Sequence, residues 1–244
     1  MKYIFVFIAA VFLSSCNSSL KMMYSNPSAV KKINLSRRGL GKIPEQVFKC
    51  ENLEVLILFK NQLKEIPPEI GKLKKLRKLV VGRNDIAKIA PEIGELSALT
   101  YFSAMFNNLK TLPPGFGNLK NLGTINLEYN QLDSLPDEIG NLQNLTFFQL
   151  NNNQLKYLPA GFSNLKNLRF LNLYRNYLKA LPAKMDSLQE LYDLNLAFCG
   201  LMQFPPTLCN LPKLEYLYLD PYSKAPYCMQ ARKRFRFNIV IVPQ

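Results

Sequence analysis

Few of the side chains that do chemistry in proteins are available in this 244-residue sequence. Histidine is absent, so the chain lacks the usual base for serine or cysteine nucleophiles and the commonest zinc ligand. Adjacent acids such as Asp137 and Glu138 follow Pro136 in a segment expected at the surface, where carboxylates are ordinarily solvated. No phosphate-binding loop, dinucleotide-binding glycine pattern or kinase signature occurs. We therefore expect no enzyme, no metal site and no cofactor.

The five cysteines call for separate interpretations. Cys50 and Cys199 fall within a regular hydrophobic pattern, and Cys50 is expected to be a buried small apolar residue. Cys209 and Cys228 lie near the C-terminus, where an oxidising compartment would allow a disulfide between them. The sequence does not fix that pairing, so it stays a hypothesis. Cys16 belongs to the N-terminal segment.

The N-terminus is organised like an export signal. Lys2 precedes an apolar stretch over residues 3–13, which is too short for a membrane-spanning helix of about 20 residues. The stretch leads into Leu13-Ser14-Ser15-Cys16, which resembles the bacterial lipobox. The resemblance implies cleavage before Cys16 and lipidation of its thiol, which would anchor the exported chain at a membrane of a bacterial cell envelope. An ordinary secretory signal with an incidental cysteine is the alternative.

Positive charge is concentrated at the two ends of the chain. The net charge is +14, with 16 Lys and Arg against 6 Asp and Glu in residues 17–90, 9 against 11 in residues 91–220, and 5 against none in residues 221–244. A nucleic-acid-binding chain would be expected to carry its basic residues along the binding surface. We therefore predict no nucleic-acid partner, and a basic end close to a membrane is the simpler explanation.

The dominant pattern is a 23-residue period marked by six asparagines. Apolar residues stand five and three positions before each asparagine, which is the alternation of a strand with one buried face. Further apolar residues stand two and five positions after it, and proline follows in every one of these repeats except one, which has Ala90. The asparagines are Asn61, Asn84, Asn107, Asn130, Asn153 and Asn176.

This pattern resembles the leucine-rich repeat LxxLxLxxNxLxxLPxxIGxL of bacterial surface proteins, plant Ras-group-related proteins and animal Ras scaffolds. The resemblance covers nearly the whole chain after residue 29. It implies an α/β-type repeat solenoid, a leucine-rich-repeat horseshoe with a parallel β-sheet on the concave face and short turns or 3-10 segments on the convex face. One unit cannot bury its own leucines, so neighbouring coils must stack and share a core.

The repeated asparagines are predicted to be structural. A buried amide must be hydrogen-bonded within the protein, and in such solenoids it bonds the turn and the adjacent coil. The terminal repeats depart from the pattern, because the first has Arg38 in the asparagine slot and the eighth has Cys199.

These boundaries define four predicted segments. We expect a cleaved signal peptide over residues 1–15, a lipidated tether and N-terminal cover over 16–29, repeats over 30–220 and a C-terminal cap over 221–244. The β-favouring run 235–243 within the cap is expected to cover the open edge of the last coil.

Side chains that alternate with the inward leucines are predicted to form the binding surface, because they face the concave side. The predicted partner-binding residues are Phe59, Tyr101, Phe106, Asn126, Tyr129, Phe147, Gln149, Phe170, Asn172, Tyr174, Arg175, Asn195, Phe198, Tyr216 and Tyr218. Aromatic rings edged by amides and arginines are typical of recognition surfaces. The alternative is that the aromatics only shield the sheet.

Two functions follow from this interpretation. The favoured one is a non-catalytic, envelope-anchored lipoprotein whose concave face binds a protein, with a glycan as the alternative ligand. The other is a scaffold or regulator of a cytoplasmic signalling complex, which requires that residues 1–16 are not an export signal. The sequence identifies neither the partner nor the side of the envelope.

Replacing Cys16 separates these two functions. We expect metabolic labelling with a fatty-acid analogue to mark the native chain and not a Cys16→Ala variant, because the thiol is the predicted acceptor of the lipid. Mass spectrometry of the N-terminal peptide is the measurement. Equal labelling of both chains, or none of the native chain, would count against the anchor.

Overall fold

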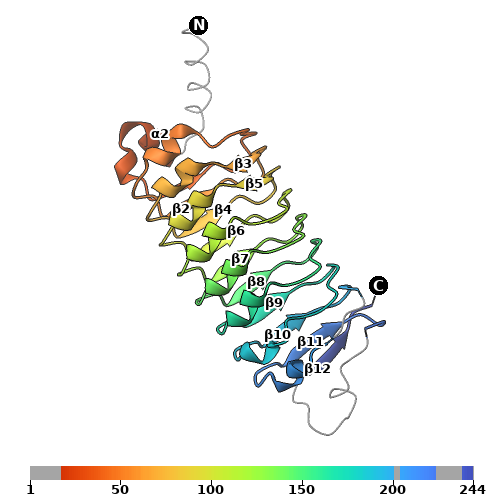
Figure 1. Cartoon of the computed structure of the whole chain (residues 1–244). Helices are drawn as coiled ribbons and strands as arrows, with labels where there is room; N and C mark the ends of the chain where they lie inside the picture. Colours follow the sequence, from red (N-terminus) through yellow and green to blue (C-terminus); the bar gives the residue numbers. More distant parts are fainter. Residues whose placement is uncertain (1–17, 201–203, 224–237, 244) are drawn as a thin grey trace.

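The structure is a computed structural model and describes residues 18–200, 204–223 and 238–243. Figure 1 shows a solenoid whose coils stack from the N-terminal to the C-terminal end, with short helices in a row along one side. Ten strands pair in parallel in the order in which they occur in the chain, and each pairs with the strand of the next coil. The leucine-rich-repeat horseshoe is therefore confirmed, with its parallel sheet and short 3-10 segments.

The sheet is built from short strands in strict register. Lys32 pairs with Val55 and Phe147 with Phe170, so each of these strands is one 23-residue period from the next. The strands are β1 (Lys32–Asn34), β2 (Val55–Ile57), β4 (Lys78–Val80), β6 (Tyr101–Ser103), β7 (Thr124–Asn126), β8 (Phe147–Gln149), β9 (Phe170–Asn172), β10 (Asp193–Asn195), β11 (Tyr216–Leu219) and β12 (Asn238–Ile241).

A 3-10 helix forms the outer side of each coil. Most begin directly after the repeated proline, whose fixed φ holds the chain extended at the helix entrance. They are η2 (Glu45–Lys49), η3 (Pro68–Lys72), η4 (Pro91–Glu95), η5 (Pro114–Asn118), η6 (Asp137–Asn141), η7 (Ala160–Asn164), η8 (Met185–Ser187) and η9 (Pro206–Asn210). Glycine is required where these helices touch, since a Cβ on Gly140 would lie 2.0 Å from the carbonyl oxygen of Gly161.

The two-stranded sheet of β3 (Glu65–Ile66) and β5 (Lys88–Ile89) was not expected. It forms where the repeat has Ala90 in place of proline. The backbone N–H of Ala90 donates to the carbonyl oxygen of Ile66 at 2.9 Å, a bond that proline cannot make. One substitution in the repeat thus adds a local ladder.

The interior is a single hydrophobic cluster that runs through all the coils. The repeated leucines and isoleucines are buried, and aromatic residues such as Phe102 and Phe116 pack among them with ring centroids 5.3 Å apart. Cys50 is buried among them, as expected.

Both ends of the stack are covered. At the N-terminal end, α2 (Ser18–Ser25) and η1 (Pro27–Ala29) pack on the first coil, and Met23 enters the core with 2% of its surface exposed. At the C-terminal end, β12 pairs with β11 and so occupies the edge that the sequence predicted to be covered. Phe235 to Phe237, from the same run, lie outside the described residues.

The asparagine side chains join neighbouring coils. Asn130 is a representative case: its Oδ1 accepts the N–H of Leu109 from the preceding coil at 3.0 Å. Its Nδ2 donates to the carbonyl oxygens of Ala104 and Leu127, both at 3.0 Å. Asn84, Asn107, Asn153 and Asn176 repeat this arrangement. In the eighth repeat Cys199 keeps one of these bonds, because its thiol donates to the carbonyl oxygen of Leu173 at 2.8 Å.

Removing one asparagine is expected to destabilise the whole stack. Asn130→Ala leaves a buried N–H and two buried carbonyl oxygens short of a partner, so the free energy of unfolding should fall by about 2–4 kcal/mol. The control Asn118→Ala changes an exposed asparagine on η5 and should alter it by less than about 0.5 kcal/mol. Urea denaturation of both variants measures the difference. Equal midpoints would contradict the structural role of the asparagine row.

Candidate binding surface

The concave face is defined as the face of the ten-stranded sheet that is turned away from the core, together with the residue before each strand and the residues between the strand and the asparagine slot. All the predicted partner-binding residues lie along it, and none of their side chains is buried. Phe147 and Phe170 are partly exposed, whereas their neighbours Phe148 and Leu171 point into the core. The strand alternation thus places the inward and outward residues where the period predicted them.

Aromatic rings form a continuous row across the last four coils before β12. The ring centroids are 5.7 Å apart between Phe147 and Phe170 and 6.0 Å apart between Phe170 and Tyr192. Tyr192 and Tyr216 follow at 5.7 Å, then Tyr216 and Tyr218 at 6.4 Å. Rings at these separations interact favourably and form a preorganised surface.

Tyr192 was missed in the sequence analysis. It occupies the position directly before the strand β10, one residue outside the slots that the alternation placed on the concave face. The sequence signal that could have found Tyr192 is its neighbourhood: Tyr216 and Tyr218 occupy concave positions in the next coil.

A second row of side chains follows the strands at a sharp corner of the backbone. The residue before each asparagine slot has a left-handed conformation, with φ between 52° and 58° in eight consecutive coils. This conformation is unfavourable for residues with a side chain, and glycine or asparagine ordinarily supplies it. The corner residues are Arg37, Lys60, Arg83, Phe106, Tyr129, Asn152, Arg175 and Phe198.

Three corner residues stack in the middle of the molecule. The rings of Phe106 and Tyr129 lie parallel with centroids 4.2 Å apart, and the guanidinium carbon of Arg83 lies 4.7 Å from the centroid of Phe106. Arg83 comes from the coil before Phe106 and Tyr129 from the coil after it, so the stack continues along the solenoid axis. Tyr129 is 44% exposed and ends the stack with an accessible ring.

The predicted row of amides is in register, but it is not a ladder of amides bonded to one another. Asn126, Asn172 and Asn195 occupy the same position of their strands. Each side-chain Oδ1 accepts the backbone N–H two residues further on, at 3.0 to 3.1 Å. Asparagine therefore turns the chain at the end of the strand. The amide nitrogen of Asn126 also donates to Glu128 Oε1 at 3.4 Å.

Gln149 and Asn151 leave acceptors without partners in the middle of this face. Gln149 Oε1 and Asn151 Oδ1 are buried oxygens with no hydrogen bond from the described residues. Asn151 Nδ2 donates to the carboxylate of Glu128 at 3.2 Å. This part of the face is rich in acceptors.

Carboxylates lie among the tyrosines of the last coils. The Tyr192 hydroxyl donates to the carboxylate of Glu215, and this bond, with burial and the nearby negative charge, raises the pKa of Tyr192 to about 12. The Tyr218 hydroxyl donates to the carboxylate of Asp193. Burial raises the pKa of Asp193, and the hydrogen bond from Tyr218 opposes that rise.

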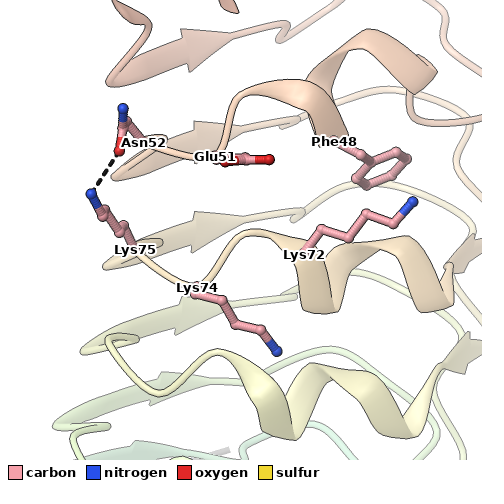
Figure 2. Close-up of a pocket in the computed structure, with 6 residues that line it drawn as sticks. All are labelled: Phe48, Glu51, Asn52, Lys72, Lys74 and Lys75. Carbon is pink, nitrogen blue, oxygen red and sulfur yellow. Dashed lines mark hydrogen bonds between the residues drawn. The ribbon is translucent and has the colours of Figure 1, made fainter. Parts of the chain in front are cut away.

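The helix side of the solenoid has a basic pocket of about 440 Å³ between the first and second coils. It is lined by Phe48, Glu51, Asn52, Lys72, Lys74 and Lys75. Figure 2 shows Lys75 bonded to Asn52, with Nζ and Oδ1 2.7 Å apart, while Lys74 points away from them. Lys74 is paired with Glu95 of the next coil. The pocket is open and belongs to the basic N-terminal part of the chain.

The remaining sequence predictions concern cysteines, metals and the membrane. Cys209 is disulfide-bonded, while Cys16 and Cys228 lie outside the described residues. Burial raises the pKa of the free Cys199 thiol to about 12, so it is a poor nucleophile. Within residues 18–200, 204–223 and 238–243, no cluster of three cysteine or acidic side chains could hold a metal. Nor does that part of the chain contain a helix long and apolar enough to cross a membrane.

Family models identify the repeats independently. A model described as Leucine Rich repeats (2 copies) matches residues 51–92 and 143–189, and one described as Leucine Rich Repeat matches residues 121–142. Residues 51–92 and 121–189 are therefore leucine-rich repeats, a scaffold that typically mediates protein interactions. No curated protein sequence matches the chain.

Solved structures share the fold. A leucine-rich-repeat protein of Leptospira interrogans is 23% identical, with a TM-score of 0.53 over 94% of this chain and 82% of that one. An internalin of Listeria monocytogenes is 19% identical, with a TM-score of 0.75 over 92% of this chain and 63% of that one. The ectodomain of the Arabidopsis thaliana receptor kinase GASSHO1/SCHENGEN3 was solved in complex with CASPARIAN STRIP INTEGRITY FACTOR 2. It is 27% identical, with a TM-score of 0.59 over 77% of this chain and 27% of that one.

A glycine substitution tests whether the left-handed conformation of the corner residues is strained. Lys60→Gly should leave the free energy of unfolding unchanged or raise it by up to about 1 kcal/mol, because glycine relieves the φ of 58°. Lys78→Gly changes another exposed lysine, in the extended strand β4, and should lower the free energy of unfolding by about 1 kcal/mol. Thermal and urea denaturation compare the two. A loss in Lys60→Gly as large as that in Lys78→Gly would rule out the strained corner.

Proposed function

We propose that this leucine-rich-repeat protein is a non-catalytic lipoprotein of a bacterial cell envelope that binds a protein partner through its concave face. The observation that carries the proposal is the continuous row of accessible rings from Phe147 to Tyr218. A monomer seldom leaves so many connected aromatic side chains to water, and aromatic residues dominate the binding energy of protein interfaces. Amides and carboxylates beside the rings supply the directional contacts that a partner needs.

A protein is favoured over a glycan as the ligand because the face has two chemically different rows. The corner residues are basic in the first three coils and a mixture of aromatic, amide and basic side chains after them. The first residue of each strand is lysine or valine in β1, β2 and β4 and is mostly aromatic from β6 to β11. An extended protein surface can satisfy both rows at once, and the long concave face of a solenoid suits such a partner.

The anchor rests on Leu13 to Cys16 and is supported by the fold of the first coil. The helix α2 begins at Ser18, only two residues after Cys16, and packs directly on that coil. A lipid on Cys16 would therefore hold the first coils close to the membrane surface. Their excess of lysine and arginine suits a position beside anionic headgroups.

Crosslinking in whole cells tests the binding face. A variant with Phe147→Ser, Phe170→Ser and Tyr174→Ser should lose a partner that the native chain captures, because all three rings lie on the concave face. The matched control carries Tyr157→Ser and Tyr177→Ser, which remove exposed rings that lie beyond the concave face, 56% and 65% exposed. Capture should survive in the control. If the control loses the partner and the first variant keeps it, the binding face is elsewhere.

A further inference from the structure

We propose that the end of the concave face around Asp193 is a subsite for a basic side chain, a lysine or arginine that the protein partner presents. This inference rests on the proposed function and names the chemistry of one contact within it. Its starting point is a carboxylate in an aromatic environment.

Asp193 is surrounded by four rings. In register with it stand Phe170 on β9 and Tyr216 on β11, each one strand away. Adjacent strands are about 4.8 Å apart, so both rings flank the carboxylate directly. Tyr192 precedes it in the chain, and its ring lies 6.0 Å from that of Phe170 and 5.7 Å from that of Tyr216. Tyr218 closes the fourth side with a hydrogen bond to the carboxylate.

No cation within the described residues neutralises this carboxylate. The ion pairs of the described chain join other residues: Lys31 to Glu54, Lys74 to Glu95 and Lys213 to Glu190. Arg169 of the adjacent coil accepts the backbone N–H of Asp193 with its carbonyl oxygen at 3.0 Å, and its guanidinium carbon lies 6.0 Å from the centroid of Phe170. A half-buried carboxylate with one neutral donor retains much of its attraction for a positive charge.

The charge of the surroundings favours the same ligand. On the concave face of the coils that contain β10 and β11, the charged side chains are Asp193, Glu215 and Asp220, and the described part of those coils has no lysine or arginine there. These carboxylates belong to a chain with a net charge of +14, five of whose basic residues lie in residues 221–244. Asp220 is already occupied by the backbone N–H groups of Phe198 and Tyr222, so Asp193 and Glu215 are the groups open to a ligand.

The aromatic rings and the carboxylate of this site both attract a cation. The faces of tyrosine and phenylalanine rings attract lysine and arginine, and the contribution of each ring grows as the ion is desolvated. The carboxylate adds a charge-assisted hydrogen bond. A neutral ligand would lack the attraction between opposite charges, and an anionic ligand would be repelled by the two carboxylates.

The test uses the purified chain and two short peptides, acetyl-Gly-Arg-Gly-amide and the same peptide with citrulline, which has the same shape and no charge. Binding is followed by NMR titration of the amides of Asp193, Asn195 and Tyr218. The arginine peptide should bind about fivefold or more tightly than the citrulline peptide. Equal affinities, or shifts confined to other coils, would overturn the proposal.

Variants separate this role from a structural one. Asp193→Asn should abolish the difference between the two peptides, whereas Asp186→Asn, on η8 at the helix side of the preceding coil, should preserve it. Because burial disfavours the Asp193 charge, Asp193→Asn should melt at the same temperature as the native chain or higher. A lower melting temperature together with an unchanged peptide preference would assign Asp193 a structural role only.

The outcome is independent of the crosslinking experiment, since no cellular partner is present. If the native chain does not distinguish the two peptides but the concave face still captures its partner, the subsite is rejected and the proposed function stands. Peptide discrimination without concave capture would reject the proposed function and leave the subsite standing.

Discussion

The bonds that the asparagine side chains make between coils are the constraint on which the rest of the structure depends. Each asparagine satisfies an N–H and a carbonyl of the preceding coil together with a carbonyl of its own. Buried backbone groups at a sharp corner would otherwise lack partners, and the coil would open to water. Because the same bonds recur every 23 residues, they also fix the register of the strands. The leucines then meet in one core, and the intervening side chains form one face.

This constraint explains why the residues proposed to bind a partner lie on the concave face of the sheet. The side chains of the concave face do not pack in the core. Aromatic, amide and charged residues can therefore replace one another there from coil to coil without disturbing the stack. The corner residues show the same freedom, because arginine, phenylalanine and asparagine all occupy a left-handed position that the asparagine bonds hold in place. The resulting face is basic at the N-terminal end and acidic and aromatic around Asp193 and Glu215.

The period alone predicted the fold, because strand alternation and the asparagine slot are repeated in every coil. It also placed Phe147, Phe170 and Tyr218 on the concave face. It could not predict the left-handed corners, since arginine or tyrosine at such a position has no local signal. Nor could it predict that Tyr218 bonds Asp193, because that contact joins two coils through side chains whose rotamers depend on their neighbours. The β3 and β5 pair depended on the single replacement of proline by Ala90.

Hydrogen exchange of five backbone amides tests the central claim most directly. The N–H groups of Leu63, Ile86, Leu109, Leu132 and Leu155 donate to asparagine side chains of the next coil. If these bonds hold the solenoid together, the amides of the middle coils should exchange only through unfolding of the stack and be among the slowest in the chain. Exchange as fast as that of amides in the exposed turns would show that the coils are held together without them.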